Sequence, residues 1–312
     1  MKRKIEEIFP KVSIIFLNWN AKQHTFELIE SLKKINYKNF DIIVSDNGST
    51  DGIEKGFDKK YGKIATLIKN KKNLGETEGL NVGIREALRR KSDYVLIMDN
   101  DMYVDKEFLE ILVEQMEKHP EVAVAGPKIY YANLNNTIWS AGCDYHLRGF
   151  KSRYQNQIDI GQADKKEYVD ALDCVLLMRA EVLKKEGVLK GEFFTMHDTT
   201  GWCMRVSRKG YRILYVPESK VWHKVSTSWD KLEKMKERNL YYDIRNWILC
   251  IKENKGIFYF MGVLFLELTL LLFVRSLEWI KRGQGGLIFP YFTAIWHALI
   301  NKTPMELYPY KH

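Results

Sequence analysis

The sequence is poor in cysteine, and its cysteines lack the spacing typical of a disulfide framework. Its four cysteines, Cys143, Cys174, Cys203 and Cys250, are far apart in 312 residues and form no Cys-x-x-Cys pair. A dense disulfide scaffold is therefore not indicated, and a reducing cytoplasm fits best. Residues 1–7 are charged and lack the apolar stretch of a secretory signal, so we expect the main domain not to cross a membrane.

Glycine-rich phosphate loops are also missing. The turn after the first predicted strand, Asn18-Trp19-Asn20-Ala21, has no glycine, which argues against a dinucleotide-binding G-x-G-x-x-G turn, and no Walker A lysine motif occurs. The 49 basic and 40 acidic residues give a net charge of +9, which favours anionic partners. Because zinc-ligand spacing and a helix-turn-helix pattern are absent, we expect no nucleic acid among them.

Strand and helix signals alternate along the first two thirds of the chain. Residues 12–17 and 40–45 are short β-branched, apolar runs, and residues 26–35 between them have helical spacing. This rhythm predicts an α/β fold, with a mainly parallel, Rossmann-like sheet flanked by helices. Further strands are expected at 64–68, 94–98, 122–126, 174–178 and 211–216, the last ended by Pro217, and further helices at 81–90, 106–118, 181–185 and 202–209.

The apolar run 94–98 ends abruptly in Asp99-Asn100-Asp101. Open α/β sheets bind ligands at the carboxyl ends of their strands, and paired carboxylates there suit Mg²⁺ or Mn²⁺. The alternative is a solvated turn, because Asp and Asn are common turn residues. Loops at Asn18, Asp46 and Asn73 are expected at the same sheet edge, where their polar groups, a metal and nearby lysines suit a nucleoside diphosphate.

The C-terminal part has a different composition. Residues 257–274 are apolar except for Glu267, and residues 287–300 form a second apolar segment with Tyr291 and Trp296. The first segment is near the lower length limit for a spanning helix, and a central charge costs about 3 kcal/mol on insertion. The segment 257–300 therefore predicts either membrane contact or a buried helix or oligomer contact. The expected division is an extension 1–9, an α/β domain 10–230 and a helical, membrane-associating region 231–312.

Ordered motifs along residues 10–250 resemble a known family. They are Val12 to Asn18, Val44 to Gly52, Asn73-Leu74-Gly75 with Asn81-Val82-Gly83-Ile84, Met98 to Asp101, Val124 to Pro127, Trp139 to Gly142, Trp202 to Arg205, Gly210 to Pro217, Val221-Trp222-His223 and Tyr241 to Asn246. In order and spacing they resemble glycosyltransferase family 2, particularly its rhamnosyltransferase-like branch. The resemblance implies a GT-A fold, a nucleotide-sugar donor, a divalent cation (Mg²⁺ or Mn²⁺) and inversion at the sugar carbon.

The resemblance also assigns roles to residues. Asp46 would contact the base, Asp99 would approach the ribose and the metal, and Asp101 would bind the metal. His223 either completes the metal shell or is a partly buried structural histidine. The donor-binding set is Asn18, Asp46, Asn73, Gly75, Asn81 and Asp99.

The chain departs from the family at two places. Where the family has an acidic Glu-Asp-x-Asp group before the Trp-Cys helix, this chain reads His197-Asp198-Thr199-Thr200-Gly201. Asp198 is the carboxylate available there, so it is assigned as the general base, with a helix N-cap as its alternative role. The second departure is Glu76 and Glu78 in the Asn73 loop, which would repel a diphosphate unless they face away or hold a cation or a sugar hydroxyl.

Together these observations predict an inverting, metal-dependent glycosyltransferase at the cytoplasmic face of the cell membrane. Its acceptor is expected to be a glycan or a lipid-linked hydroxyl in cell-envelope polysaccharide or glycoconjugate synthesis. Two alternatives stay open: a catalytically silent nucleotide-sugar-binding protein, suggested by the Asp198 segment, and an enzyme that transfers to polyprenyl phosphate.

Overall fold

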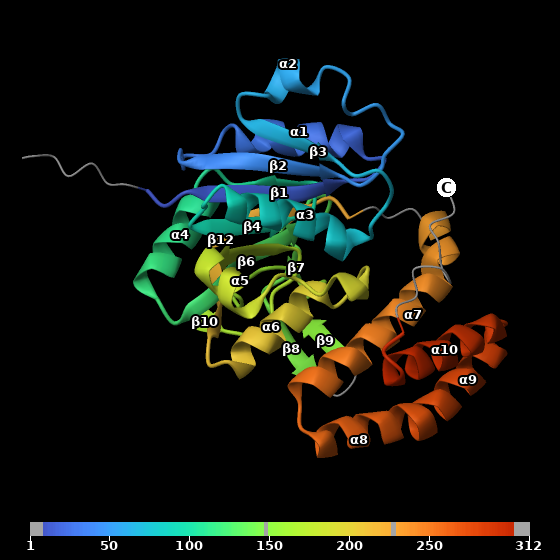
Figure 1. Cartoon of the computed structure of the whole chain (residues 1–312). Coiled ribbons are helices and arrows are strands. Elements are labelled where there is room, and N and C mark those ends of the chain that lie inside the picture. The colour runs from blue at the N-terminus through green and yellow to red at the C-terminus, as the bar shows by residue number, and fades with distance from the viewer. Residues whose placement is uncertain (1–8, 147–148, 226–228, 303–312) are drawn as a thin grey trace, which may run out of the picture.

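A ten-stranded mixed sheet forms the centre of the protein in the computed structural model, which describes residues 9–146, 149–225 and 229–302 (Figure 1). The main path through the sheet is β10-β12-β6-β11-β4-β1-β2-β3, with β5 beside β12 and β7 beside β6. The predicted α/β fold is confirmed. The strands are β1 Val12–Asn18, β2 Phe40–Asp46, β3 Ala65–Lys69, β4 Tyr94–Met98, β5 Met102–Val104, β6 Val122–Tyr131, β7 Ile138–Ser140, β10 Glu167–Tyr168, β11 Val175–Arg179 and β12 Arg212–His223.

Helices cover both faces of this sheet, which explains why its central strands β1, β4 and β11 are mostly apolar. Leu28 of α1 and Leu112 of α4 pack on one face, whereas Ile84 of α3, Leu183 of α5 and Val206 of α6 pack on the other. The helices of this domain are α1 Lys22–Leu32, α2 Phe57–Tyr61, α3 Glu76–Arg89, α4 Phe108–Lys118, α5 Ala180–Glu186 and α6 Asp198–Arg208.

Helix α3 begins five residues before the predicted start at residue 81. Gly75 precedes it with a φ of 84°, and Glu76 and Glu78 lie in its first turn. Carboxylates stabilise a helix N-terminus through its dipole, so these residues extend the helix although they add nothing to its apolar face. As a result, the start of α3 points at the sheet edge where the ligand was expected.

Strand β12 continues past Pro217, contrary to the prediction that this proline ends it. Its pairing with β6 is interrupted between Val216 and Lys220, and a proline is tolerated at such an irregularity because no ladder N–H is needed there. Beyond it, β12 pairs with β5 and aligns His223 with Met102. The continued strand thus brings His223 next to the loop that contains Asp99 and Asp101.

The region 130–166 contains short strands between long loops. Strands β8 (Cys143–His146) and β9 (Gly149–Ser152) form a separate two-stranded sheet. The following loop is fastened to β6 by the buried Lys128, whose Nζ donates to Asp159 Oδ2 at 2.8 Å and pairs with Asp164. Trp139, Cys143, Phe150 and Ser152 from this part of the chain line a cavity at the sheet edge.

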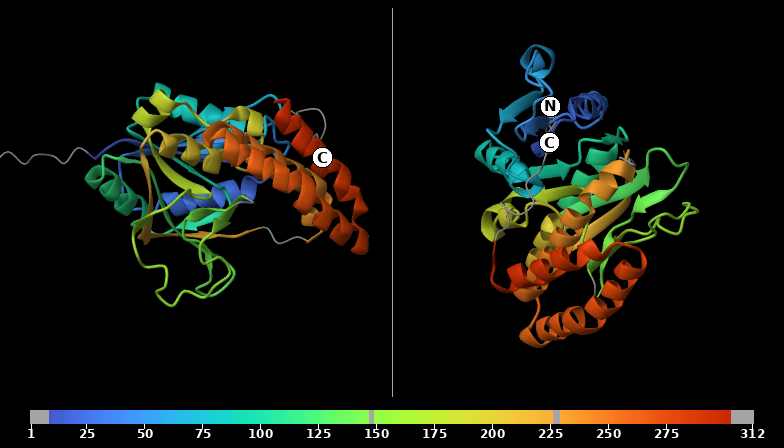
Figure 2. Two further views of the ribbon diagram at one scale, coloured as in Figure 1. Left: turned by 90° about the horizontal axis from the view of Figure 1, so that it is seen from below. Right: turned by 90° about the vertical axis from the view of Figure 1, so that its right-hand side faces the viewer.

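The C-terminal helices form a separate layer below the sheet in Figure 1 and at the lower end of the molecule in the right view of Figure 2. They have their own apolar core, which includes Trp247, Tyr291 and Ile295. Helices α8 and α9 are joined by a π-helical turn, and the stretch Ile257–Lys281 is long and apolar enough to cross a membrane. The helices are α7 Trp229–Asn254, α8 Ile257–Leu266, α9 Leu272–Lys281 and α10 Ile288–Leu299.

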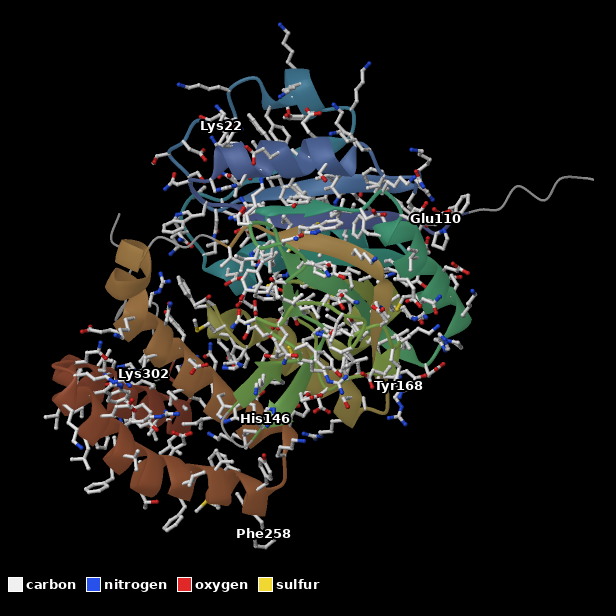
Figure 3. The ribbon with its side chains drawn as sticks, turned by 180° about the vertical axis from the view of Figure 1, so that it is seen from behind. Lys22, Glu110, His146, Tyr168, Phe258 and Lys302 are labelled. Atoms are coloured by element: carbon white, nitrogen blue, oxygen red, sulfur yellow. The ribbon has the colours of Figure 1, made fainter. Side chains whose placement is uncertain are left out.

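Glu267, the charge within the apolar segment, is buried against its neighbours. It accepts a hydrogen bond from Tyr291 of α10, and Arg275 lies 3.5 Å from the same carboxylate. Large apolar side chains are instead exposed on this layer: Phe258 is 91% exposed and Phe289 73%. Phe258 points away from the body of the protein in Figure 3.

Candidate active site

The carboxyl ends of β1, β2 and β4 meet at one sheet edge, as expected for parallel strands. The register sets Asn18 opposite Asp46, and the Asn18 Nδ2 donates to Asp46 Oδ1 at 3.1 Å and to Asp51 Oδ2 at 3.2 Å. Thr25 Oγ1 donates to Asn18 Oδ1 at 3.0 Å. Asn18 is fully buried, so it organises this edge from below.

The Asp46 loop is tied to the Asn73 loop through Asn47. The Asn47 Nδ2 donates to Asn73 Oδ1 and to Gly75 O, both at 2.9 Å. Asp46 is 1% exposed, and its Oδ2 is buried with no hydrogen-bond partner among the described residues. An unpaired buried carboxylate oxygen is costly, so this atom is suited to accept an N–H from a ligand.

Two adjoining cavities open at this edge. The first, of about 460 Å³, is lined by Leu17, Trp19, Asn20, Ala21, His24, Asn47, Asn73, Glu76, Leu80, Met98, Asp99, Asn100, Asp101 and His223. The second, of about 510 Å³, is lined by Glu76, Leu80, Ile97, Met98, Asp99, Trp139, Cys143, Phe150, Ser152, Asp173, Cys174, Thr195 to Thr200, His223 and Asp243. Five residues line both: Glu76, Leu80, Met98, Asp99 and His223.

Asp99, Asp101 and His223 come together where the two cavities meet. His223 Nε2 lies 3.0 Å from Asp101 Oδ1 and 3.7 Å from Asp99 Oδ2, and the ring of Trp139 packs edge-on against the imidazole. The Cys174 thiol lies within 4.8 Å of the ligand atoms of Asp99 and His223. Two carboxylates that both lie within 3.7 Å of one imidazole nitrogen fit a divalent cation such as Mn²⁺ or Mg²⁺.

The protonation of this group is perturbed by burial and by its own charges. Burial raises the pKa of Asp99 to about 6, against the opposing charge of His223. Burial also disfavours the charged forms of Asp101 and His223, but their mutual hydrogen bond outweighs it, so the pKa of Asp101 is lowered and that of His223 is raised. The group therefore favours a negative carboxylate at Asp101, as a cation ligand requires.

Asp198 lies in the second cavity at the start of α6. His197 occupies the N-cap position, and Asp198 is the first helical residue, 6% exposed. Its Oδ2 accepts from Thr77 Oγ1 at 3.1 Å and its Oδ1 from the Thr199 N–H at 2.9 Å. Burial raises the pKa of Asp198, and these hydrogen bonds limit the rise.

The backbone before Asp198 is strained. Phe194, Met196 and His197 have φ values of 63°, 61° and 60°, in the left-handed region that non-glycine residues rarely occupy. The buried Nδ2 of Asn246 on α7 holds this segment, at 2.9, 2.7 and 3.0 Å from the carbonyl oxygens of residues 193, 195 and 196. His197 Nε2 also lies 2.9 Å from Asp243 Oδ1 of the same helix.

The two additional glutamates of the Asn73 loop face in different directions. Glu78 lies outside both cavities and pairs with Arg85 at 2.6 Å. Glu76 lines both cavities, and its Oε2 accepts from Thr195 Oγ1 at 2.6 Å. Burial and the negative charges of Asp198 and Asp99 raise the pKa of Glu76 to about 8.

The sequence-predicted residues thus have different places in the site. Asn73, Asp99, Asp101, His223 and Asp198 line the cavities, whereas Asn18, Asp46, Gly75 and Asn81 are absent from both linings. Asn81 is buried and donates to Leu189 O at 2.9 Å and to Glu78. Gly75 allows close packing, because a Cβ there would lie 2.5 Å from the Phe194 ring. Direct donor contacts from these four residues stay predictions.

Sequence reasoning missed several lining residues. Trp19, Asn20 and Asn47 stand in the predicted loops beside the chosen positions, so the loops themselves were the available signal. Asp173 and Cys174 precede β11, and nothing in the local sequence pattern marks them as partners of the cavity. Asp243 belongs to α7 and lies in the motif Tyr241 to Asn246, so that motif was the available signal.

Comparison with known proteins assigns the family. The sequence profile described as Glycosyl transferase family 2 matches residues 13–187, more than half of the chain. The chain belongs to this family. It is 24% identical over 193 residues to the dTDP-rhamnosyl transferase RfbF of Shigella flexneri, covering 58% of this chain and 62% of that protein. It is 35% identical over 120 residues to the putative glycosyltransferase EpsE of Bacillus subtilis, covering 38% of this chain and 42% of EpsE.

Solved structures share the GT-A-like fold of this family 2 chain at low sequence identity. GalNAc-T7 with UDP, GalNAc and Mn²⁺ superposes with a TM-score of 0.62 at 13% identity, over 79% of this chain and 48% of that one. The mannosyltransferase PcManGT of Pyrobaculum calidifontis with GDP-Man and Mn²⁺ superposes with a TM-score of 0.58 at 13% identity, over 94% of this chain and 88% of that one. The predicted fold class is therefore confirmed, including an apolar C-terminal helix that is a candidate for membrane association.

Proposed function

We propose that this chain is a nucleotide-sugar glycosyltransferase that depends on a divalent cation and inverts the sugar carbon. The observation that carries the proposal is the pair of adjoining cavities that share Asp99 and His223. The first is lined by the amides of Asn20, Asn47 and Asn73, which suit a nucleoside, and the second contains Asp198. A donor in one and an acceptor in the other would meet at the shared residues.

Family membership and the neighbours' ligands support the donor half of this proposal. The fold neighbours were solved with UDP and GalNAc or with GDP-Man, in both cases with Mn²⁺. We assign Asp99, Asp101 and His223 to the cation. A cation bound there would supply positive charge to the departing diphosphate.

Asp198 is the proposed general base. Inversion requires the acceptor hydroxyl to attack from the face opposite the leaving group, and a carboxylate must take its proton. Asp198 is suited to this because it lies in the second cavity, and the Thr77 and Thr199 hydrogen bonds fix its orientation. A threonine hydroxyl has no useful basicity near neutral pH, so Thr199 could not replace it.

The C-terminal layer supports a membrane-associated acceptor, at the cytoplasmic face of the cell membrane. Asp243 of α7 lines the second cavity, and α7 packs against α10 and α8, which carry exposed Phe289 and Phe258. A surface that buries these rings in lipid would bring the second cavity close to lipid-linked acceptors. A glycan acceptor uses the same cavity without the membrane.

The test is nucleotide release from a panel of nucleotide sugars with Mn²⁺, with and without lipid acceptors. The Asp198→Asn variant should lose at least ~100-fold in kcat while keeping donor affinity. A parent protein that binds donors but releases no nucleotide would support the catalytically silent alternative. Turnover with polyprenyl phosphate in preference to hydroxyl acceptors would support the second alternative, an enzyme that transfers the sugar to polyprenyl phosphate.

A further inference from the structure

The residues shared by the two cavities define where the transferred sugar must lie. The bond to the diphosphate breaks in the first cavity and the bond to the acceptor forms in the second, so the sugar occupies their junction. Of the five shared residues, Leu80 and Met98 are apolar, and Asp99 and His223 belong to the proposed cation group. Glu76 is the remaining polar side chain of the junction.

The backbone explains why Glu76 reaches the junction and Glu78 does not. Glu76 is the first residue of α3, and Glu78 follows two positions later, about 200° further around the helix. Glu78 is therefore held on the outer side by Arg85. Glu76 is oriented by Thr195 Oγ1, which donates to its Oε2 at 2.6 Å.

The chemistry of Glu76 at this place suits a sugar hydroxyl better than a phosphate. Burial and the negative charges of Asp198 and Asp99 raise its pKa to about 8, against the hydrogen bond from Thr195 and the charge of Arg238. A carboxyl group offers acceptor oxygens and, when protonated, an O–H donor. A hydroxyl group has the complementary pair of functions. A neutral Glu76 adds no charge repulsion against the diphosphate, and Glu78 lies outside both cavities, paired with Arg85.

We propose that Glu76 binds a hydroxyl group of the transferred sugar and thereby determines which donor is used. This inference rests on the proposed glycosyltransferase function. It adds a specificity-determining residue to the site and defines the donor class as sugars that present a free hydroxyl to the α3 side of the junction.

The experiment measures kcat/KM for the best donor of the parent protein and for its monodeoxy analogues, with Mn²⁺ in excess. Glu76→Ala is compared with the parent, and Glu76→Gln keeps the size and hydrogen bonding of the side chain. Glu78→Gln is the matched control in the same helical turn. We expect Glu76→Ala to lose about 10- to 100-fold with the full donor, and Glu76→Gln and Glu78→Gln to lose less than about threefold.

The deoxy analogues separate recognition from a structural role. With the parent protein, one deoxy analogue should have a kcat/KM about 10- to 100-fold below that of the full donor. With Glu76→Ala, the same analogue and the full donor should have similar kcat/KM values, because the hydrogen bond is already absent. If Glu76→Ala lowers kcat/KM by the same factor for the donor and for every analogue, the assignment is wrong. A parent protein that turns over no nucleotide sugar would overturn the proposed function together with this inference.

Discussion

Removing the Asn246 amide should separate catalysis from donor binding. This buried side chain donates to carbonyls of residues 193, 195 and 196, in the segment before Asp198 where Phe194, Met196 and His197 have left-handed backbone. An amide has two N–H groups, and the Asn246 Oδ1 also accepts from Arg245 at 2.7 Å, so Asn246→Ala deletes about three buried hydrogen bonds and leaves buried polar groups unpaired, at about 1–3 kcal/mol each. We therefore expect at least about 3 kcal/mol less stability.

The functional consequence follows from the strain in that segment. Without the amide, the left-handed residues relax and Asp198 moves, and a misplacement of about 1 Å can cost about 100-fold in rate. The assay is kcat for nucleotide release, below the melting temperature of the variant, beside calorimetric binding of a nucleoside diphosphate. Binding should be unchanged, because Asn246 lines neither cavity.

The control is Asn254→Ala in the same helix. Its amide makes one hydrogen bond to the carbonyl of residue 250 within the helix, so we expect a small change in stability and none in kcat. If Asn246→Ala is destabilised but keeps the parental kcat, the segment does not position Asp198 as argued.

Three further predictions concern the cation, the base and the membrane. Asp101→Asn should lower Mn²⁺ affinity about 10-fold or more, measured by titration of free Mn²⁺, because it removes a proposed ligand; unchanged affinity would place the ion elsewhere. Because burial raises the pKa of Asp198, kcat should fall as pH drops through a midpoint above the ordinary value of about 4, where the base gains its proton, and Asp198→Asn should lack this limb. Phe258→Asp should weaken sedimentation with anionic vesicles without lowering the melting temperature, because Phe258 is exposed on α8. The control Ile160→Asp, at an 86% exposed position on the α/β domain, should leave sedimentation unchanged. Equal vesicle binding by both variants would argue against lipid contact by α8.

The strands and their polar ends were predictable because short apolar runs followed by Asp and Asn have a local signal. Residues 94–98 and Asp99 are the clearest case, since a buried parallel strand must be apolar and its carboxyl end opens to the ligand. The start of α3 was missed because the residues from Glu76 onward lie at a helix N-terminus, where capping and dipole effects replace apolar periodicity. The continuation of β12 past Pro217 depends on a pairing irregularity that has no local signal.

The contacts that complete the site could not be predicted, because they join distant parts of the chain. Asn246 reaches carbonyls about fifty positions earlier, and Thr77 reaches Asp198. The opposite orientations of Glu76 and Glu78 depend on where α3 begins. In the sequence, the charge of Glu267 argued against an apolar C-terminal helix in contact with lipid. In the structure, Glu267 is buried and accepts a hydrogen bond from Tyr291, so its carboxylate faces the neighbouring helix.

A crystal structure of the parent protein with Mn²⁺ and a nucleoside diphosphate would show directly whether the two cavities form a donor site. We expect the nucleoside in the first cavity, beside Trp19 and Asn73, the cation on Asp99 and Asp101, and the terminal phosphate at the junction with Glu76. The Asp198 carboxylate should face that phosphate across the second cavity. A nucleotide bound elsewhere, or a cation without Asp99 and Asp101 among its ligands, would contradict this donor site.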